Sequence, residues 1–272
     1  MKIILSRKGF DSGAGGSPSP ILPDGTLLSI PIPDKTGNCS YEDLTFPTEG
    51  KTYLDILNAL NPGRDYCHCH LDPDIRTYIR KTPPEWVPAF GQIDASQTHL
   101  TSKGIKKGDL FLFFGWYKQT EYLNGKLSFV KGAPDLQVIY GYLQIGDIIT
   151  GKDVKNYPWH PHSDDSHIYD NNGNTTNNTI YIASDYLDID GINGILPGAG
   201  VLSFSENRVL TEKGKSRTRW KLNDVLLNVN LSYHNKECIK DDYFQSRYRG
   251  QEFVFDEDRR ATEWAKHIIM GE

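Results

Sequence analysis

Short apolar runs separated by turn residues dominate the chain, whereas the helical spacing of apolar residues is sparse. Runs rich in β-branched and aromatic residues, bounded by Gly, Pro, Asn and Asp, predict strands. Asn124-Gly125 between two such runs predicts a β-hairpin. The segments that we expect to be strands are Lys2–Ser6, Leu27–Ile32, Leu110–Tyr117, Glu121–Leu123, Lys126–Val130, Leu136–Ile149, Thr179–Ala183, Val201–Phe204 and Val225–Val229.

Three segments carry a helical pattern. Tyr53–Leu60 has an apolar face, Ala95–Lys103 ends at a glycine, and Glu257–Met270 has Asp256 as a candidate cap. Strands outnumber helices and no linker separates them, which predicts a strand-rich α+β protein with one domain over residues 1–272. A Gly-Asp turn that enters a buried strand is compatible with a PUA-like β-barrel subdomain near residues 90–150.

Composition narrows the class of protein. Hydrophobic residues make up 38% of the 272 residues, enough to bury a core. The longest apolar run, Leu110–Tyr117, is too short for a membrane helix, and the first residues are unlike a signal peptide. We therefore expect a cytoplasmic protein without membrane contact, with its four cysteines as thiols. The net charge of −5 means that any contact with nucleic acid uses a local patch.

A glycine-rich loop follows the first predicted strand. Basic side chains and glycine backbone N–H groups can hold a phosphate, although the loop matches neither a dinucleotide-binding nor a Walker pattern. The alternative is an ordinary surface loop. The candidate cofactor-binding residues of this loop are Arg7, Lys8, Asp11, Ser12, Gly15 and Gly16.

A run of histidines and aspartates follows the first predicted helix, at residues 67–74. In an extended segment His68, His70 and Asp72 share one face, because strand side chains alternate. That face could hold a divalent metal ion, or His70, Asp72 and Asp74 could form an acid–base site. An ordinary surface strand ending at Pro73 is the remaining alternative.

A second histidine-bearing segment lies between two later predicted strands. His160 and His162 are followed by Asp164, Asp165 and His167. Clustered imidazoles and carboxylates could complete a metal site or hold a polar substrate, and a solvated loop is the alternative. We take His160 and His162 as candidate catalytic residues.

Further candidate residues, polar or aromatic, lie within the predicted strands or near their ends. Trp116 at a strand end could stack on a base, and the basic stretch that includes Arg219 suits a phosphate. A core or surface role is the alternative for each of them. The candidate substrate-binding residues are Gln92, His99, Trp116, Gln144, Arg219, His234 and Gln251.

Several longer motifs occur in one order along the chain. They read SRKGFDSGAGGSPSPILPDG, HLDPD, FGQ…HL…GDLFLFFGW, GYLQIGD, HPH, LTEKG…RW, SYH and GQEFVFD. In this respect the chain resembles the third type of the nucleotide modification associated domain family, from residue 1 to about 256. That resemblance implies a protein that acts on or recognises nucleotides or modified bases in phage or bacterial DNA modification. It points to the polar residues of these motifs as the site.

Two functions follow as hypotheses. The favoured one is an enzyme that acts on a phosphate-bearing nucleotide or base through a His/Asp site, with a divalent metal as a possible cofactor. The alternative is a PUA-like module that reads a modified base without catalysis. An accessory protein whose motifs are only structural is a third reading. Either of the first two implies a nucleotide or a nucleic acid as the partner.

Overall fold

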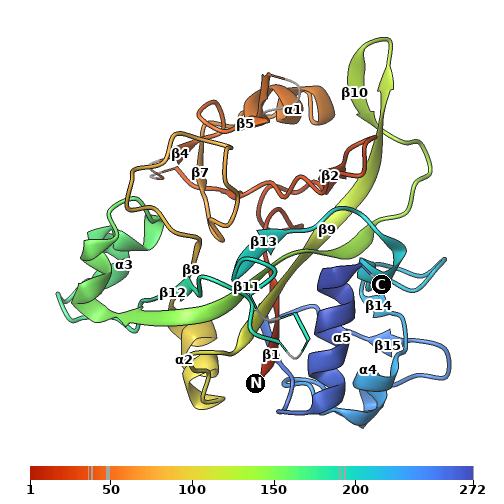
Figure 1. Cartoon of the computed structure of the whole chain (residues 1–272). Coiled ribbons are helices and arrows are strands. Elements are labelled where there is room, and N and C mark those ends of the chain that lie inside the picture. The colour runs from red at the N-terminus through yellow and green to blue at the C-terminus, as the bar shows by residue number, and fades with distance from the viewer. Residues whose placement is uncertain (36, 38, 47–49, 190, 193, 272) are drawn as a thin grey trace.

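A nine-stranded sheet forms the centre of the molecule, here described from a computed structural model (Figure 1). The structure describes all residues except 36, 38, 47–49, 190, 193 and 272. The main path through the sheet is β16 (Glu252–Val254), β1 (Ile3–Arg7), β9 (Leu110–Leu123), β11 (Leu136–Thr150), β12 (Thr179–Ala183) and β8 (Ala89–Gln92). Three shorter strands join it, namely β2 (Ser19–Ile21) and β10 (Lys126–Phe129) on β9 and β13 (Ala199–Val201) on β11.

Both faces of the central strands are buried, which explains their continuous apolar sequence. Ile3 and Leu5 pack into one apolar cluster, whereas Ile4 between them packs into another on the opposite face. β1 runs parallel to β9, and β16 and β11 flank this pair antiparallel. The hairpin predicted at Asn124-Gly125 is confirmed, with positive φ angles of 51° and 77° that suit its two-residue turn.

Two helices cover one face of the sheet. α5 (Arg259–Met270) buries Ala261, Ala265, Ile268 and Ile269 beside α4 (Asp224–Asn228), and it begins after Asp258 rather than Asp256. The prediction of a strand at Val225–Val229 is wrong. Asn223 accepts a hydrogen bond from the Leu226 N–H and caps a short helix there.

The N-terminal part of the chain forms a separate apolar cluster beside the sheet (top of Figure 1). It contains α1 (Tyr53–Leu60), the three-stranded sheet of β3 (Ile32–Pro33), β7 (His68–His70) and β4 (Cys39–Ser40), and the pair β5 (Thr45–Phe46) and β6 (Lys51–Thr52). The predicted strand Leu27–Ile32 is largely wrong. Leu27, Leu28 and Ile30 are buried, but their backbone is irregular.

The remaining elements are short. α2 (Asp94–Ser102) follows β8 and confirms the second predicted helix. The segment between β11 and β12 folds into small helical turns. The short elements are η1 (Gly151–Asn156), η2 (Pro161–Ser163), α3 (Asp165–Ile168), η3 (Glu206–Arg208), η4 (Lys236–Cys238), β14 (Arg219–Trp220) and β15 (Phe244–Gln245).

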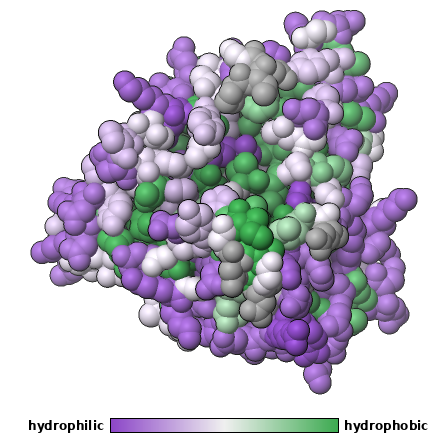
Figure 2. All heavy atoms as spheres, viewed as in Figure 1, coloured by the Kyte–Doolittle hydropathy of each residue, from purple (hydrophilic) through white to green (hydrophobic). Residues whose placement is uncertain are grey.

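The architecture is mixed α/β and strand-rich, and the PUA-like barrel expected near residues 90–150 is not confirmed. Within the described residues the sheet does not close into a barrel, because its strand path ends at β16 on one side and at β8 on the other. No described helix is long and apolar enough to cross a membrane. On the face shown in Figure 2, apolar residues gather near the middle and hydrophilic ones occupy the margin.

Candidate functional site

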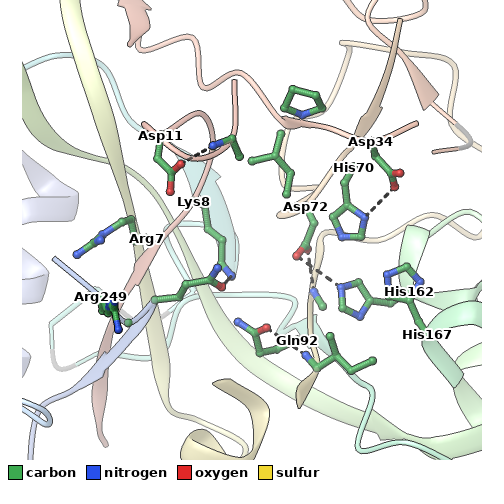
Figure 3. Close-up of a pocket in the computed structure, with 18 of the residues that line it drawn as sticks. Arg7, Lys8, Asp11, Asp34, His70, Asp72, Gln92, His162, His167 and Arg249 are labelled. Carbon is green, nitrogen blue, oxygen red and sulfur yellow. Dashed lines mark hydrogen bonds and ion pairs between the residues drawn. The ribbon is translucent and has the colours of Figure 1, made fainter. Parts of the chain in front are cut away.

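A cleft of about 520 Å³ lies between the N-terminal segment, β8 and the chain that leads into β16 (Figure 3). Figure 3 shows basic side chains on one side, imidazoles on the other, and Asp72 and Gln92 between them. The fold thus brings together segments that are far apart in the sequence. The predicted site residues that line this cleft are Arg7, Lys8, Asp11, His70, Asp72, Gln92, His162 and Gln251.

Three imidazoles converge on one wall of the cleft. His70 comes from β7, His162 from η2 and His167 from α3, and one nitrogen of each lies within 4.8 Å of the others. The ring centres of His162 and His167 are 4.8 Å apart, and that of His70 is 5.2 Å from His162. The cluster therefore joins the two histidine-bearing segments that the sequence showed separately.

Asn178 fixes the orientation of the His162 ring. The Asn178 side-chain amide donates to the His162 carbonyl at 2.7 Å, so its oxygen faces His162 Nδ1 at 2.6 Å. The Nδ1 atom must carry the proton in that contact, which leaves Nε2 with a lone pair. Burial lowers the pKa of His162 to about 3, so the ring is neutral at pH 7.

Asp72 lies beside this cluster, almost fully buried. Its Oδ1 accepts a hydrogen bond from the Gly91 N–H at 2.8 Å, and its Oδ2 is 3.9 Å from His162 Nε2. Burial alone would raise the pKa of Asp72. The contact with His160 and the electrostatic interactions with His162, His160 and Lys8 outweigh burial and hold that pKa below its ordinary value.

His160 is completely buried and orients Asp72 from behind. Its Nδ1 accepts a hydrogen bond from the His162 N–H at 3.2 Å, so the ring proton sits on Nε2. That Nε2 is 3.5 Å from Asp72 Oδ1. His160 is therefore placed to position the carboxylate, while His162 and His70 line the cleft itself.

The basic residues predicted to hold a phosphate already have partners. The Arg7 guanidinium donates to the carbonyl oxygens of Tyr248 at 2.6 Å and Arg247 at 2.8 Å. Lys8 Nζ is 3.1 Å from the buried Glu252 carboxylate. Both cations therefore hold the walls of the cleft together, and their charges are already engaged by protein groups rather than available to a phosphate.

A buried polar network forms the floor beside Lys8. Glu252 accepts hydrogen bonds from the Gln92 side-chain amide at 2.7 Å and the Ser6 hydroxyl at 3.1 Å. Gln251, next to it, accepts weakly from Lys8 at 3.5 Å. Sequence reasoning missed Glu252, although a glutamate inside the apolar strand β16 was a detectable signal.

Other residues of the glycine-rich loop have packing roles. A Cβ on Gly15 would lie 2.3 Å from the Phe10 ring, and one on Gly16 would lie 2.7 Å from the Arg64 guanidinium. These glycines allow close packing, and neither lines the cleft. The Ser12 hydroxyl contacts Arg217.

Trp116 is covered rather than open for stacking. The Arg217 guanidinium carbon lies 3.9 Å from the centre of the Trp116 ring, and Trp116 Nε1 donates to Asp135 at 2.9 Å. Arg219 lies over Tyr243 at 5.0 Å. Neither residue lines the cleft, so the structure does not bring this predicted substrate-binding pair to the site.

Asp74 and Gln144 serve the fold and lie outside the cleft. Asp74 is 1% exposed, pairs with Arg80 and accepts a hydrogen bond from Trp86 Nε1 at 2.8 Å. The Gln144 side chain donates to the carbonyl of Asp188 at 3.0 Å and accepts from its N–H at 2.6 Å. The hydrogen bonds of both side chains are thus directed to neighbouring protein groups.

Two predicted histidines lie elsewhere. His68 sits on β7 opposite Ser40, where it does not join the cluster of His70. His99 contacts the Ser232 hydroxyl at 2.9 Å and stacks on Tyr233. These positions follow from strand and helix geometry that a spacing pattern alone does not specify.

His234 supports the cleft from outside. Its Nδ1 donates to the Ser232 carbonyl at 2.9 Å, and its Nε2 accepts from the Arg247 N–H at 3.0 Å. Together with Arg7, it fixes the segment Arg247–Gly250 that forms one rim.

Four polar side chains of the cleft were not among the predicted site residues. His167 was noted in its loop but not selected, and Asp34, Tyr248 and Arg249 carried no motif signal. Arg249 is exposed and makes no hydrogen bond or ion pair with any residue that the structure describes. Tyr248 beside it is 66% exposed.

The sequence matches the family described as Nucleotide modification associated domain 3 over residues 2–256. The chain matches no curated protein and no solved structure. The match spans the sheet, the N-terminal cluster and every residue of the cleft, and leaves out α5. The chain therefore belongs to the Nucleotide modification associated domain 3 family.

Proposed function

We propose that the protein is an enzyme that modifies a phosphate-bearing nucleotide, or a base within a nucleic acid, in the cleft described above. Membership of a nucleotide modification family supports the substrate class. The observation that carries the proposal is the placement of the buried Asp72 carboxylate and three imidazoles in one cleft with the unpaired Arg249. Perturbed titratable groups in a polar cleft are typical of catalytic sites.

The rim segment offers groups that suit a nucleotide. Arg249 can pair with a phosphate, and the exposed ring of Tyr248 can stack on a base. The volume of about 520 Å³ is within the range for small-molecule sites, which is about 300–1,000 Å³.

Asp72 is the residue that we assign to the chemical step. Its lowered pKa keeps it ionised at pH 7, so it supplies a fixed negative charge and a hydrogen-bond acceptor at the cleft wall. The Gly91 N–H and His160 hold the carboxylate in one orientation. Such preorganised charge stabilises positive charge or a donated proton in a transition state.

The test compares the nucleosides of cells that produce the wild-type chain, Asp72→Asn or Asp24→Asn, by mass spectrometry. Living cells supply any co-reactant. We expect the wild type and Asp24→Asn, which changes an exposed turn carboxylate, to alter the nucleoside composition of the DNA or the nucleotide pool. Asp72→Asn is expected to lose this effect while remaining folded. Unchanged nucleosides with the wild type, or full activity of Asp72→Asn, would contradict the proposal.

A second function is favoured by one observation, the exposed Tyr248 ring next to Arg249. An exposed aromatic beside a cation can bind a modified base without catalysis. This reader would bind modified DNA more tightly than unmodified DNA and leave the nucleosides unchanged. The same mass analysis separates the two functions.

A further inference from the structure

The geometry points to a divalent transition-metal site formed by His70, His162 and His167 on the wall of the cleft. The ion would be held by three imidazole nitrogens from three different elements, with a further position open toward the cleft. The role of the ion in catalysis rests on the proposed function. Binding of the ion does not, because it requires no nucleotide.

The three side chains are arranged as a ligand set. One nitrogen of each lies within 4.8 Å of the others, so small side-chain rotations bring all three to the bond length of about 2.0–2.1 Å from one ion. His162 is 3% exposed and its Nε2 lone pair is free, because Nδ1 is engaged by Asn178. His167 Nδ1 is buried without a hydrogen-bond partner among the described residues.

The contact between His162 and Asp72 favours a positive charge beside them. His162 Nε2 and Asp72 Oδ2, only 3.9 Å apart, both present lone pairs to the space between them. A bound cation at the histidine cluster would satisfy the nitrogen and balance the carboxylate together.

Groups behind the histidines match the outer shell of a metal site. Metal-bound histidines usually donate their second nitrogen to a carbonyl or carboxylate, which fixes the ring. His162 has the Asn178 side-chain oxygen at 2.6 Å in this role, and His70 Nδ1 has the Asp34 carboxylate 3.8 Å away.

The donor atoms define the class of ion. Three neutral imidazoles suit zinc and other first-row transition metals, whereas Mg²⁺ and Ca²⁺ prefer oxygen ligands. Three histidines with one open position form the arrangement found in catalytic zinc sites. We therefore expect Zn²⁺ or Co²⁺ to bind, and Mg²⁺ not to compete.

The test uses the full chain, freed of any affinity tag, stripped with a chelator and titrated with Zn²⁺ and with Co²⁺. We expect one ion per wild-type chain. His167→Ala, a change in a short surface helix, should weaken binding by more than about 100-fold, beyond the loss caused by an outer-shell change. His68→Ala is the matched control and should bind as the wild type does, because His68 lies outside the cluster.

Three outcomes would overturn the inference. They are the absence of stoichiometric binding to the folded wild type, unchanged binding by His167→Ala, and loss of binding in His68→Ala. Far-UV circular dichroism shows whether each variant is folded. X-ray absorption of the zinc-loaded wild type counts imidazole ligands without any variant, and fewer than two would also overturn the inference. Metal bound without nucleoside modification would contradict the proposed function alone.

Discussion

Asp72 and His162 face each other with two hydrogen-bond acceptors, so neither side chain can donate a hydrogen bond to the other. The carboxylate is ionised and the imidazole is neutral, yet their closest acceptor atoms lie 3.9 Å apart. Because the fold pays a desolvation cost to keep both buried, a functional reason for the pair is expected. The nearby backbone is adapted to it, since Gly91 donates its N–H to Asp72 and leaves room for the His162 ring.

Gly91→Ala tests this close approach. A Cβ at residue 91 would lie 2.3 Å from the His162 ring, so the ring must move. We expect a loss of stability of about 1–3 kcal/mol from overpacking, together with weaker metal binding. Urea unfolding and zinc titration measure the two effects. Gly13→Ala, in the exposed loop, is the control, and wild-type zinc affinity in Gly91→Ala would contradict the assigned geometry.

His234 gives a prediction about pH. Burial lowers its pKa to about 4, while the unfolded chain has the ordinary value near 6.5. Between these values the unfolded state binds a proton that the folded state does not, so stability falls as the pH drops from 6.5 to 4. Well above pH 6.5 both states are neutral, and this contribution to the pH dependence vanishes.

His234→Gln should therefore lose less stability than the wild type over this pH range. Urea unfolding at pH 7, 6, 5 and 4 gives the comparison for both proteins. The variant is expected to be less stable at pH 7 by about 1 kcal/mol, because its side chain no longer accepts the Arg247 N–H in the same geometry. An equal decline in both proteins would show that His234 does not titrate as described.

The segment Arg247–Gly250 is held as a unit by residues from other elements. Arg7 on β1 binds two of its carbonyl oxygens, and His234 accepts one of its N–H groups. This support leaves Tyr248 and Arg249 exposed at the rim of the cleft. The segment is thus a preformed edge of the site, held by the half-buried Arg7.

Arg7→Lys should loosen this rim. A lysine keeps the charge but cannot make both hydrogen bonds of the guanidinium fork. We expect trypsin to cleave after Arg247 or Arg249 about 10- to 100-fold faster, the change that corresponds to one lost charge-assisted hydrogen bond. Arg217→Lys, which alters a cation over Trp116, is the control. Equal cleavage rates in Arg7→Lys and the wild type would contradict the role of Arg7 in holding this segment.

Elements with a clear local pattern were predictable from the sequence, and contacts between distant segments were not. α1 and β12 appear with the predicted bounds, because their apolar spacing and turn residues are local signals. The helix α4 was predicted as a strand, because Val225–Val229 has strand propensity that the Asn223 cap and packing against α5 override. The irregular segment around Leu28 is buried, so its apolar residues gave a false strand signal.

The site was predictable in part for the same reason. Motifs indicated His70, Asp72 and His162, whose chemistry is visible in the sequence. The alternation rule grouped His70 with His68, whereas the fold groups it with His162 and His167 from a segment about 90 residues later. Arg249 could not be found from the sequence, because it is a candidate only through its exposed position at the rim without a hydrogen-bond or ion-pair partner among the described residues.

At the scale of the whole molecule, the helix α5 stabilises the core but lies outside the cleft. α5 packs on the sheet face through residues such as Ile268, which is 2% exposed, and contributes no residue to the cleft. Ile268→Ala should lower the free energy of unfolding by about 2–5 kcal/mol through the cavity it creates. Zinc and nucleotide binding by the folded variant should remain unchanged. Binding losses that parallel the loss of stability would show that the site depends on this helix.

The central claim, that the cleft binds a nucleotide through its rim, is tested most directly by calorimetric titration of nucleoside monophosphates and triphosphates into the metal-loaded chain. The wild type is compared with Arg249→Ala and with Arg259→Ala, which removes an exposed arginine from α5. We predict that Arg249→Ala weakens binding about 10- to 100-fold, as expected for one charge-assisted contact, and that Arg259→Ala does not. Binding that both variants retain in full, or no binding by the wild type, would contradict the account.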